Sequence, residues 1–166
     1  MFKFMLLVFG FVVSAFVTEA QSADDQELNT SVRTYNEKIN ELQTLHTKNG
    51  FGVYKEQRIP LQSGIEHVIL LKLVAGSWYH FSYVGDPNSD KINATLFKEG
   101  IGDLVQARIQ VAQQKEFWVE FSFICPQSGI YELTLRQKCP ISRPLSYLTV
   151  FQKLAPVATN NNAQSE

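Results

Sequence analysis

Histidine is the side chain most often used for metal binding and general base catalysis, and this 166-residue chain contains His46, His67 and His80. None of them stands in a His-x-x-x-His or comparable spacing, which would place two imidazoles on one face of a helix. The spacing therefore predicts no metal site and no cofactor. His80 lies in a stretch that alternates like a β-strand, and it is predicted to be an exposed strand histidine.

The carboxylates are the next candidates for chemistry. Glu120 and Glu132 take outward positions on consecutive strand-like segments, where two acids can approach each other as glycoside hydrolysis requires. Carboxylates on a sheet surface are ordinarily solvated. The chain also has no Gly-x-Ser-x-Gly elbow and no phosphate-binding glycine loop. We therefore predict no catalytic residues and no enzyme activity.

Asp86, Asn88 and Asp90 offer oxygen ligands at alternate positions of one loop, like the opening of a calcium-binding loop. The glycine and the bidentate glutamate that complete such a loop are replaced by Lys91 and Phe97. A calcium site at Asp86, Asn88 and Asp90 is thus a candidate, and an ordinary polar turn is the alternative.

Two tryptophans are candidates for binding a ligand. Trp78 and Trp118 fall opposite the more apolar set of residues on their strands, and His80 shares the outward side with Trp78. Outward aromatic rings stack on sugars or anchor a protein partner, so Trp78, His80 and Trp118 form the predicted ligand-binding set. The alternative is that a helix covers both tryptophans.

Cys125 and Cys139 are the two cysteines of the chain. An exported protein favours a disulfide between them. A hairpin closed at Gln127-Ser128-Gly129 would instead hold them roughly 20 Å apart, since each strand residue spans about 3.3 Å. Both alternatives stay open.

The ends of the chain predict export. Lys3 precedes an apolar run, and Thr18-Glu19-Ala20 supplies small residues for cleavage, so residues 1–20 are predicted to be a signal peptide. The run is shorter than the roughly 20 residues of a membrane span, so the chain is predicted to be secreted or periplasmic and not membrane-spanning. Residues 156–166 are predicted to be a disordered tail.

The charge balance excludes one class of partner. The chain has 15 Lys and Arg against 16 Asp and Glu, a net charge of −1. Its basic residues do not cluster along the sequence, whereas nucleic-acid binding usually needs a basic face. No nucleic-acid partner is predicted.

The region 21–50 is predicted to be one amphipathic helix. Asp24 and Glu27 form an acidic capping box, and Asn49-Gly50 supplies the C-terminal stop. Apolar side chains then recur at steps of four and three, namely Leu28, Val32, Tyr35, Ile39, Leu42 and then Leu45 or His46. This stripe packs either on a sheet, which we favour, or on a second copy through Leu28 to Leu42, which would make a homo-oligomer.

From residue 51 to residue 155 the period changes to two, which predicts β-strands. The expected strands are 52–59, 65–74, 77–84, 91–98, 105–112, 117–124, 130–136 and 146–153. The evenly apolar segment 65–74 is expected to be a central strand. About eight short strands without intervening helices predict a mainly β fold, a jelly-roll-like antiparallel β-sandwich preceded by the amphipathic helix.

Four strand motifs resemble those of bacterial pre-peptidase C-terminal domains and related exported jelly-roll sandwiches. They are Gly76-Ser77-Trp78-Tyr79-His80-Phe81-Ser82, Asn93-Ala94-Thr95-Leu96-Phe97, Phe117-Trp118-Val119-Glu120-Phe121 and Ser128-Gly129-Ile130-Tyr131-Glu132-Leu133-Thr134-Leu135. The resemblance covers about residues 59 to 151 and implies a non-catalytic accessory or binding module. We therefore expect a module that binds a protein or a glycan at a cell surface or in the periplasm. The alternative is an assembly protein that oligomerises through its N-terminal helix.

Overall fold

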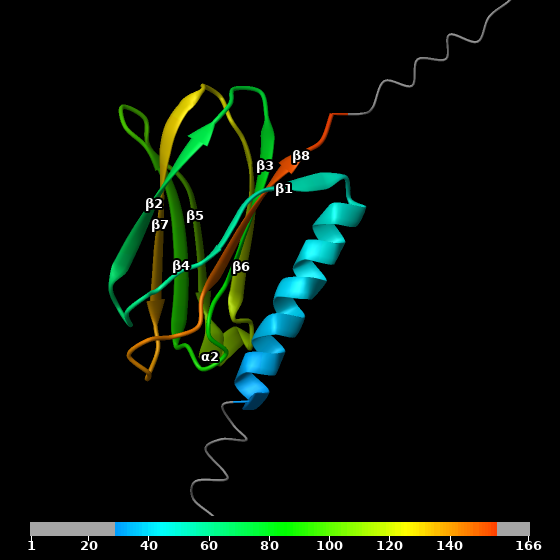
Figure 1. Cartoon of the computed structure of the whole chain (residues 1–166). Helices are drawn as coiled ribbons and strands as arrows, with labels where there is room; N and C mark the ends of the chain where they lie inside the picture. Colours follow the sequence, from blue (N-terminus) through cyan, green and yellow to red (C-terminus); the bar gives the residue numbers. More distant parts are fainter. Residues whose placement is uncertain (1–28, 156–166) are drawn as a thin grey trace, which may run out of the picture.

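A computed structural model describes residues 29–155, so the predicted signal peptide, the capping box and the predicted tail lie outside the described residues. Within this range the chain forms one long helix over residues 29–48, a short helix and eight strands (Figure 1). The strands and the short helix are β1 Phe51–Arg58, β2 Glu66–Leu73, β3 Trp78–Val84, β4 Lys91–Lys98, β5 Gly102–Gln110, α2 Val111–Gln114, β6 Trp118–Ile124, β7 Gly129–Lys138 and β8 Tyr147–Lys153.

The strands form two four-stranded antiparallel sheets. Sheet A has the order β1-β8-β3-β6 and sheet B the order β2-β7-β4-β5. One long hairpin contains four strand pairs, namely β1·β8, β2·β7, β3·β6 and β4·β5. Two further pairs, β3·β8 and β4·β7, join these four pairs within the sheets. A long hairpin curled in this way is a jelly roll, so the predicted fold class is confirmed.

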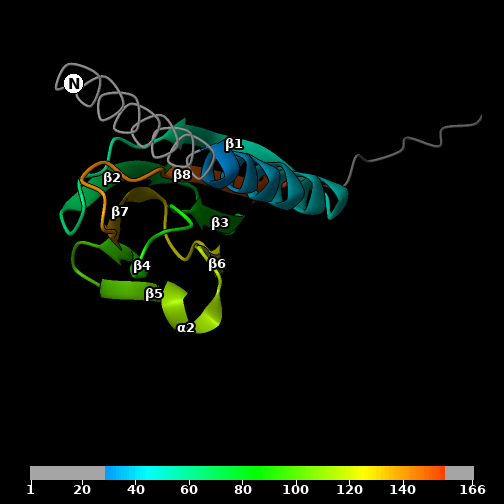
Figure 2. The same ribbon diagram turned by 90° about the horizontal axis from the view of Figure 1, so that it is seen from below.

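The two sheets lie face to face (Figure 2), and side chains from both of them form the core. Successive side chains of a strand point to opposite faces, and most of the inward set is buried. Its largest members include Tyr79, Phe81, Tyr83, Tyr131, Leu133 and Leu135. These inward residues are the ones that the period-two pattern of the sequence predicts.

The long helix lies on the outer face of sheet A, over β1 and β8 (Figures 1 and 2). Tyr35 and Leu42 are buried in the same apolar cluster as the sandwich core, and Ile39 packs against that cluster. His46 is buried while Leu45 is exposed, so His46 continues the stripe. The stripe therefore packs on the sheet, as favoured, and Tyr35 and Leu42 are not available as a dimer seam.

The helix ends where the sequence predicts. Residue 48 is the last helical residue, and Gly50 has φ of +75°, the left-handed conformation that favours glycine. The chain then turns directly into β1.

Two strand predictions are wrong. Segment 65–74 is expected to be central, but β2 pairs only with β7 and is an edge strand. Its outward apolar residues Val68 and Leu70 lie in solvent instead of under a covering layer. The strand predicted over 105–112 ends at Gln110, because the chain coils into α2 and turns at Lys115, which adopts φ of +56°.

Across residues 29–155 no helix combines the length and the apolar character needed to cross a bilayer.

Candidate functional site

The predicted ligand-binding set contains two tryptophans, Trp78 and Trp118, which we call the aromatic platform, and their environments differ. The Trp118 ring is half-buried, and the Lys38 ammonium of the long helix lies 4.0 Å from its centroid. Trp78 stays 42% exposed, with the Phe51 ring edge-on at 5.3 Å. The helix therefore covers Trp118 and leaves Trp78 open, so the alternative in which a helix covers both tryptophans is correct for Trp118 and wrong for Trp78.

The prediction of an exposed His80 is wrong. Its side chain is only 14% exposed, because His46, near the C-terminal end of the long helix, packs on it. The centroids of the two imidazole rings are 3.9 Å apart. His46 Nε2 and His80 Nε2 both lie within hydrogen-bonding distance of Glu120 Oε1, at 2.8 and 3.1 Å. His80 Nδ1 lies 2.9 Å from the Ser122 hydroxyl.

Glu120 is the shared partner of both imidazoles. Burial alone would raise its pKa, but the hydrogen bonds and positive charges of His80 and His46 outweigh burial and hold the pKa below its ordinary value. The approach of Glu120 to Glu132 that their outward positions allowed does not occur. Glu120 lies on β6 of sheet A and Glu132 on β7 of sheet B, so the two carboxylates stand on opposite sheets.

The candidate calcium loop is held by backbone hydrogen bonds. The buried Asp86 carboxylate accepts the Asn88 amide through Oδ1 at 2.9 Å and the Leu145 amide through Oδ2 at 3.0 Å. Asn88 and Asp90 are exposed. This arrangement is that of a turn in which an aspartate closes its own loop and ties it to the segment before β8.

Cys125 and Cys139 are free and buried. Cys125 follows β6 and its thiol contacts the Tyr131 hydroxyl at 3.4 Å, whereas Cys139 follows the far end of β7. Burial raises the pKa of the Cys139 thiol, which makes it less reactive as a nucleophile. The disulfide alternative is not realised in this structure.

Within residues 29–155 no helix covers the outer face of sheet B, and one end of that face is basic. The register places Lys91 of β4 directly opposite Lys138 of β7, and Asn93 opposite Arg136 on the same two strands. Arg108 of β5 lies opposite Asn93 on the other side. Three adjacent strands thus bring together four cationic side chains that are distant in sequence.

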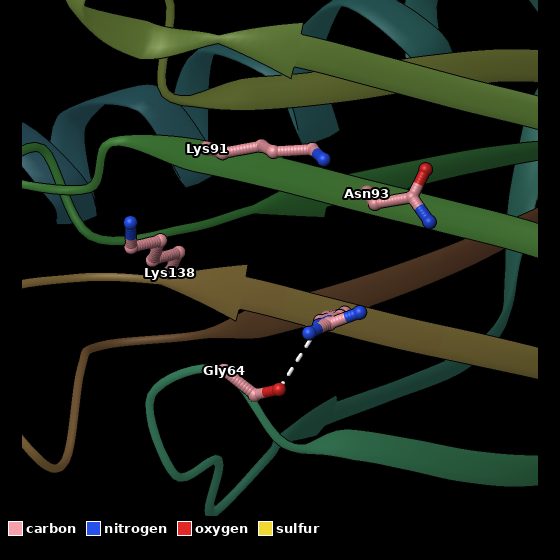
Figure 3. Close-up of a pocket in the computed structure, with 5 residues that line it drawn as sticks. Gly64, Lys91, Asn93 and Lys138 are labelled. Carbon is pink, nitrogen blue, oxygen red and sulfur yellow. Dashed lines mark hydrogen bonds between the residues drawn. The ribbon is translucent and has the colours of Figure 1, made fainter.

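A pocket of about 150 Å³ is lined by Lys91, Asn93, Arg136 and Lys138 together with Gly64 of the loop before β2 (Figure 3). Arg136 donates from Nε to the Gly64 carbonyl at 2.9 Å and keeps an exposed, long contact of 3.8 Å with Glu66. No carboxylate within residues 29–155 makes an ion pair with Lys91, Arg108 or Lys138. The buried Oδ1 of Asn93 has no hydrogen-bond partner within that range.

The neighbouring positive charges affect the protonation of the Lys91 ammonium. Its pKa lies below the ordinary value, first because of partial loss of solvent and then because of the positive charges of Arg108, Arg136 and Lys138. Like charges directly opposite each other on a sheet destabilise it. The arrangement is therefore unfavourable for folding and suited to an anion that neutralises it.

Sequence reasoning misses this cluster because its residues come from three strands whose order is not visible in a single sequence. Alternation does place Arg108 and Arg136 on the outward side of their strands. The expectation that basic residues do not cluster holds along the chain and fails on the surface.

No model of a known protein family matches this sequence, and no curated protein does. The resemblance to pre-peptidase C-terminal domains therefore stays a prediction. Among solved structures, the chain is similar to PliG of Aeromonas hydrophila, a periplasmic inhibitor of g-type lysozyme, at 13% identity and a TM-score of 0.43 over 62% of this chain and 87% of that one.

Two carbohydrate-binding modules are also similar. One is described as CBM4, with 13% identity and a TM-score of 0.35 over 62% of this chain and 78% of that one. The other is CBM6cm-2 of Cellvibrio mixtus lichenase 5A, with 10% identity and a TM-score of 0.33 over 60% of this chain and 88% of that one. Likenesses this distant leave the function of this chain to be argued from its own residues.

Proposed function

We propose that this chain is an exported, non-catalytic binding module that takes an acidic glycan on the open face of sheet B. The observation that carries the proposal is the group of four cations, Lys91, Arg108, Arg136 and Lys138, on the outer face of sheet B. The predicted signal peptide supports a location outside the cytoplasm, where such polymers are found on cell surfaces.

A glycan fits this site better than a bare carboxylate does. An ionised carboxylate only accepts hydrogen bonds, whereas the pocket offers acceptors as well as cations. The Gly64 carbonyl lines the pocket, and the Asn93 amide is not held by a hydrogen bond at Oδ1, so it is able to turn toward a ligand. A sugar that carries both hydroxyl groups and a carboxylate or sulfate satisfies both sets of groups.

The rigidity of the site supports binding without large rearrangement. Lys91 and Asn93 stand on β4, and Arg136 and Lys138 stand on β7, the two central strands of sheet B. Central strands are paired on both sides, so their outward side chains start from fixed backbone positions.

The test is a binding titration of the full chain with a sulfated polysaccharide, a uronic acid polysaccharide and a neutral glucan. We expect binding to the two acidic polymers that weakens as salt is raised. The triple variant Lys91→Ser, Arg136→Ser, Lys138→Ser should bind about tenfold more weakly or worse, since each charged contact contributes about 0.2–1 kcal/mol.

The matched control is Lys48→Ser, Lys55→Ser, Lys115→Ser, which removes the same charge from other surfaces and should bind like the wild type. Equal loss in the two triple variants would mean that only net charge matters. A loss confined to Trp78→Ala, or binding to the neutral glucan alone, would overturn the proposal in favour of the aromatic platform.

A further inference from the structure

The cluster of His46, His80 and Glu120 lies on the other sheet, beneath the helix, and the glycan-binding proposal does not use it. We propose that these three residues bind a divalent transition-metal ion of the Zn²⁺ class, which clamps the long helix onto sheet A. One ligand comes from the helix, one from β3 and one from β6.

The spacing of the donor atoms fits such an ion. The two imidazole nitrogens and the carboxylate oxygen all lie within 4.8 Å of one another, and the two contacts to Glu120 Oε1 measure 2.8 and 3.1 Å. Ligands bound to zinc at about 2.1 Å in a tetrahedral arrangement stand about 3.4 Å apart. The two Glu120 contacts would therefore lengthen by about 0.3–0.6 Å to admit the ion, and the two imidazole nitrogens stand within 4.8 Å of each other.

The donor chemistry selects the class of metal. Two imidazoles and one carboxylate suit zinc, copper, nickel or iron, whereas calcium and magnesium prefer oxygen ligands alone. His₂Glu is also a ligand set that zinc uses when one coordination position stays open to water or another ligand. The Glu120 side chain is 24% exposed, so this open position has access to solvent.

The surroundings orient the ligands as metal sites require. The Ser122 hydroxyl lies 2.9 Å from His80 Nδ1 and can accept a hydrogen bond from Nδ1–H, the tautomer that leaves Nε2 bare for the metal. The Phe151 ring packs 4.9 Å from the His46 ring and faces His80 across the β3·β8 pair. Apolar walls of this kind limit the access of water to the bound ion.

The balance of protons gives the proposal a pH signature. Without metal, each imidazole donates a hydrogen bond from Nε2–H to the Glu120 carboxylate, because an ionised carboxylate only accepts. When a metal binds at Nε2, that proton moves to Nδ1 or leaves for solvent. In acid, protons compete with the metal for the ring nitrogens and the carboxylate, so affinity for the metal should fall.

The experiment titrates the chelator-treated full chain with Zn²⁺ by calorimetry and follows thermal unfolding. We expect one Zn²⁺ per chain and a midpoint raised by about 5–10 °C at saturation. Calcium and magnesium should give no heat and no shift. Co²⁺ in place of Zn²⁺ should show the visible absorption of a site with nitrogen ligands.

Three variants assign the ligands. His46→Gln and Glu120→Gln keep polar side chains of similar size and should weaken Zn²⁺ binding by about 100-fold or more, since outer partners alone account for 10–100-fold. Ser122→Ala should weaken it by about tenfold while leaving the folded state intact. His67→Gln, at the half-buried histidine of β2, is the matched control and should bind like the wild type.

The wild-type titration does not depend on how well any variant folds. Absence of stoichiometric Zn²⁺ binding in the wild type would overturn the proposal. So would binding that survives both His46→Gln and Glu120→Gln in variants with unchanged circular dichroism. Neither result would affect acidic-glycan binding on sheet B, which is measured on the opposite face.

Discussion

The outer faces of the two sheets have similar alternating sequences and opposite environments. On sheet A the outward residues His80, Glu120 and Trp118 lie under a helix and are half-buried; His80 and Glu120 form a hydrogen bond, and Trp118 contacts the Lys38 ammonium. On sheet B no helix within residues 29–155 covers the outward residues Lys91 and Lys138, which lie opposite each other, with Lys138 exposed and Lys91 half-buried. An outward residue is therefore polar either because it bonds to a covering helix or because it lies on an uncovered face. Only the presence of the covering helix distinguishes the two cases.

The comparison also separates the ways in which charge is handled. The covered face places one carboxylate between two imidazoles, so its charges are compensated within the fold. The open face gathers cations without an equal number of acids, so compensation has to come from solvent ions or a ligand. We regard the first arrangement as stabilising the fold and the second as serving binding.

The largest expected effect comes from removing the helix contact that covers sheet A. Tyr35 is 2% exposed in the apolar cluster, and Tyr35→Ala should lower the free energy of unfolding by about 3–5 kcal/mol, the usual cost of truncating a buried aromatic residue. Urea unfolding monitored by circular dichroism measures this loss. Leu45→Ala, on the exposed side of the same helix, should change stability by less than about 0.5 kcal/mol. Equal effects in the two variants would mean that the helix does not cover the sheet.

The carboxylate beneath the helix gives the next effect. In metal-free buffer at neutral pH, Glu120→Gln should lower stability by about 1–3 kcal/mol, because it weakens two charge-assisted hydrogen bonds. The pKa of Glu120 is depressed in the folded state from its ordinary value of 4.5. Its contribution is therefore present above that value and is lost as the pH falls through the lower, folded pKa.

Urea unfolding of the wild type and of Glu120→Gln between neutral and strongly acidic pH measures this contribution. The stability difference should be constant near neutral pH and shrink below about 4.5. A difference that stays constant into strong acid would show that the Glu120 charge does not support the docking of the helix.

Sequence reasoning reaches most of the fold because local patterns determine most of it. The period-two alternation identifies the inward residues of each strand, and Asn49-Gly50 marks the end of the helix. The edge position of β2 is missed because Val68 and Leu70 are apolar and exposed, and exposure depends on the pairing of strands rather than on residue type.

The candidate sites are harder to predict, because each is assembled from several elements. His46 and His80 meet only after the helix folds onto the sheet, and neither lies in a recognisable spacing. Lys91 and Lys138 become neighbours only through the β4·β7 register. A single sequence indicates which residues point outward, but it does not indicate which residues lie beside them on neighbouring strands.

A smaller effect tests how the helix covers Trp118. The Lys38 side chain is 16% exposed, lies 4.0 Å from the Trp118 centroid and also contacts Glu41. Lys38→Ala should cost about 0.5–1 kcal/mol through the lost cation–π contact. In a double-mutant cycle with Trp118→Leu, that cost should largely disappear. A cost unchanged in the Trp118→Leu background would assign it to the Glu41 contact instead, and Lys48→Ala serves as the exposed control.

The smallest effect has the opposite sign and belongs to the open face. Lys138→Gln removes a charge that lies directly opposite Lys91, and should raise the free energy of unfolding by about 0.2–0.5 kcal/mol at low salt. The gain should shrink as salt is added, because exposed charges are screened. Lys115→Gln changes the net charge equally at an exposed turn and should leave stability unchanged. If Lys138→Gln instead loses stability independently of salt, the lysine supports the fold through packing. The basic face would then no longer contrast with the covered face as a surface kept for binding.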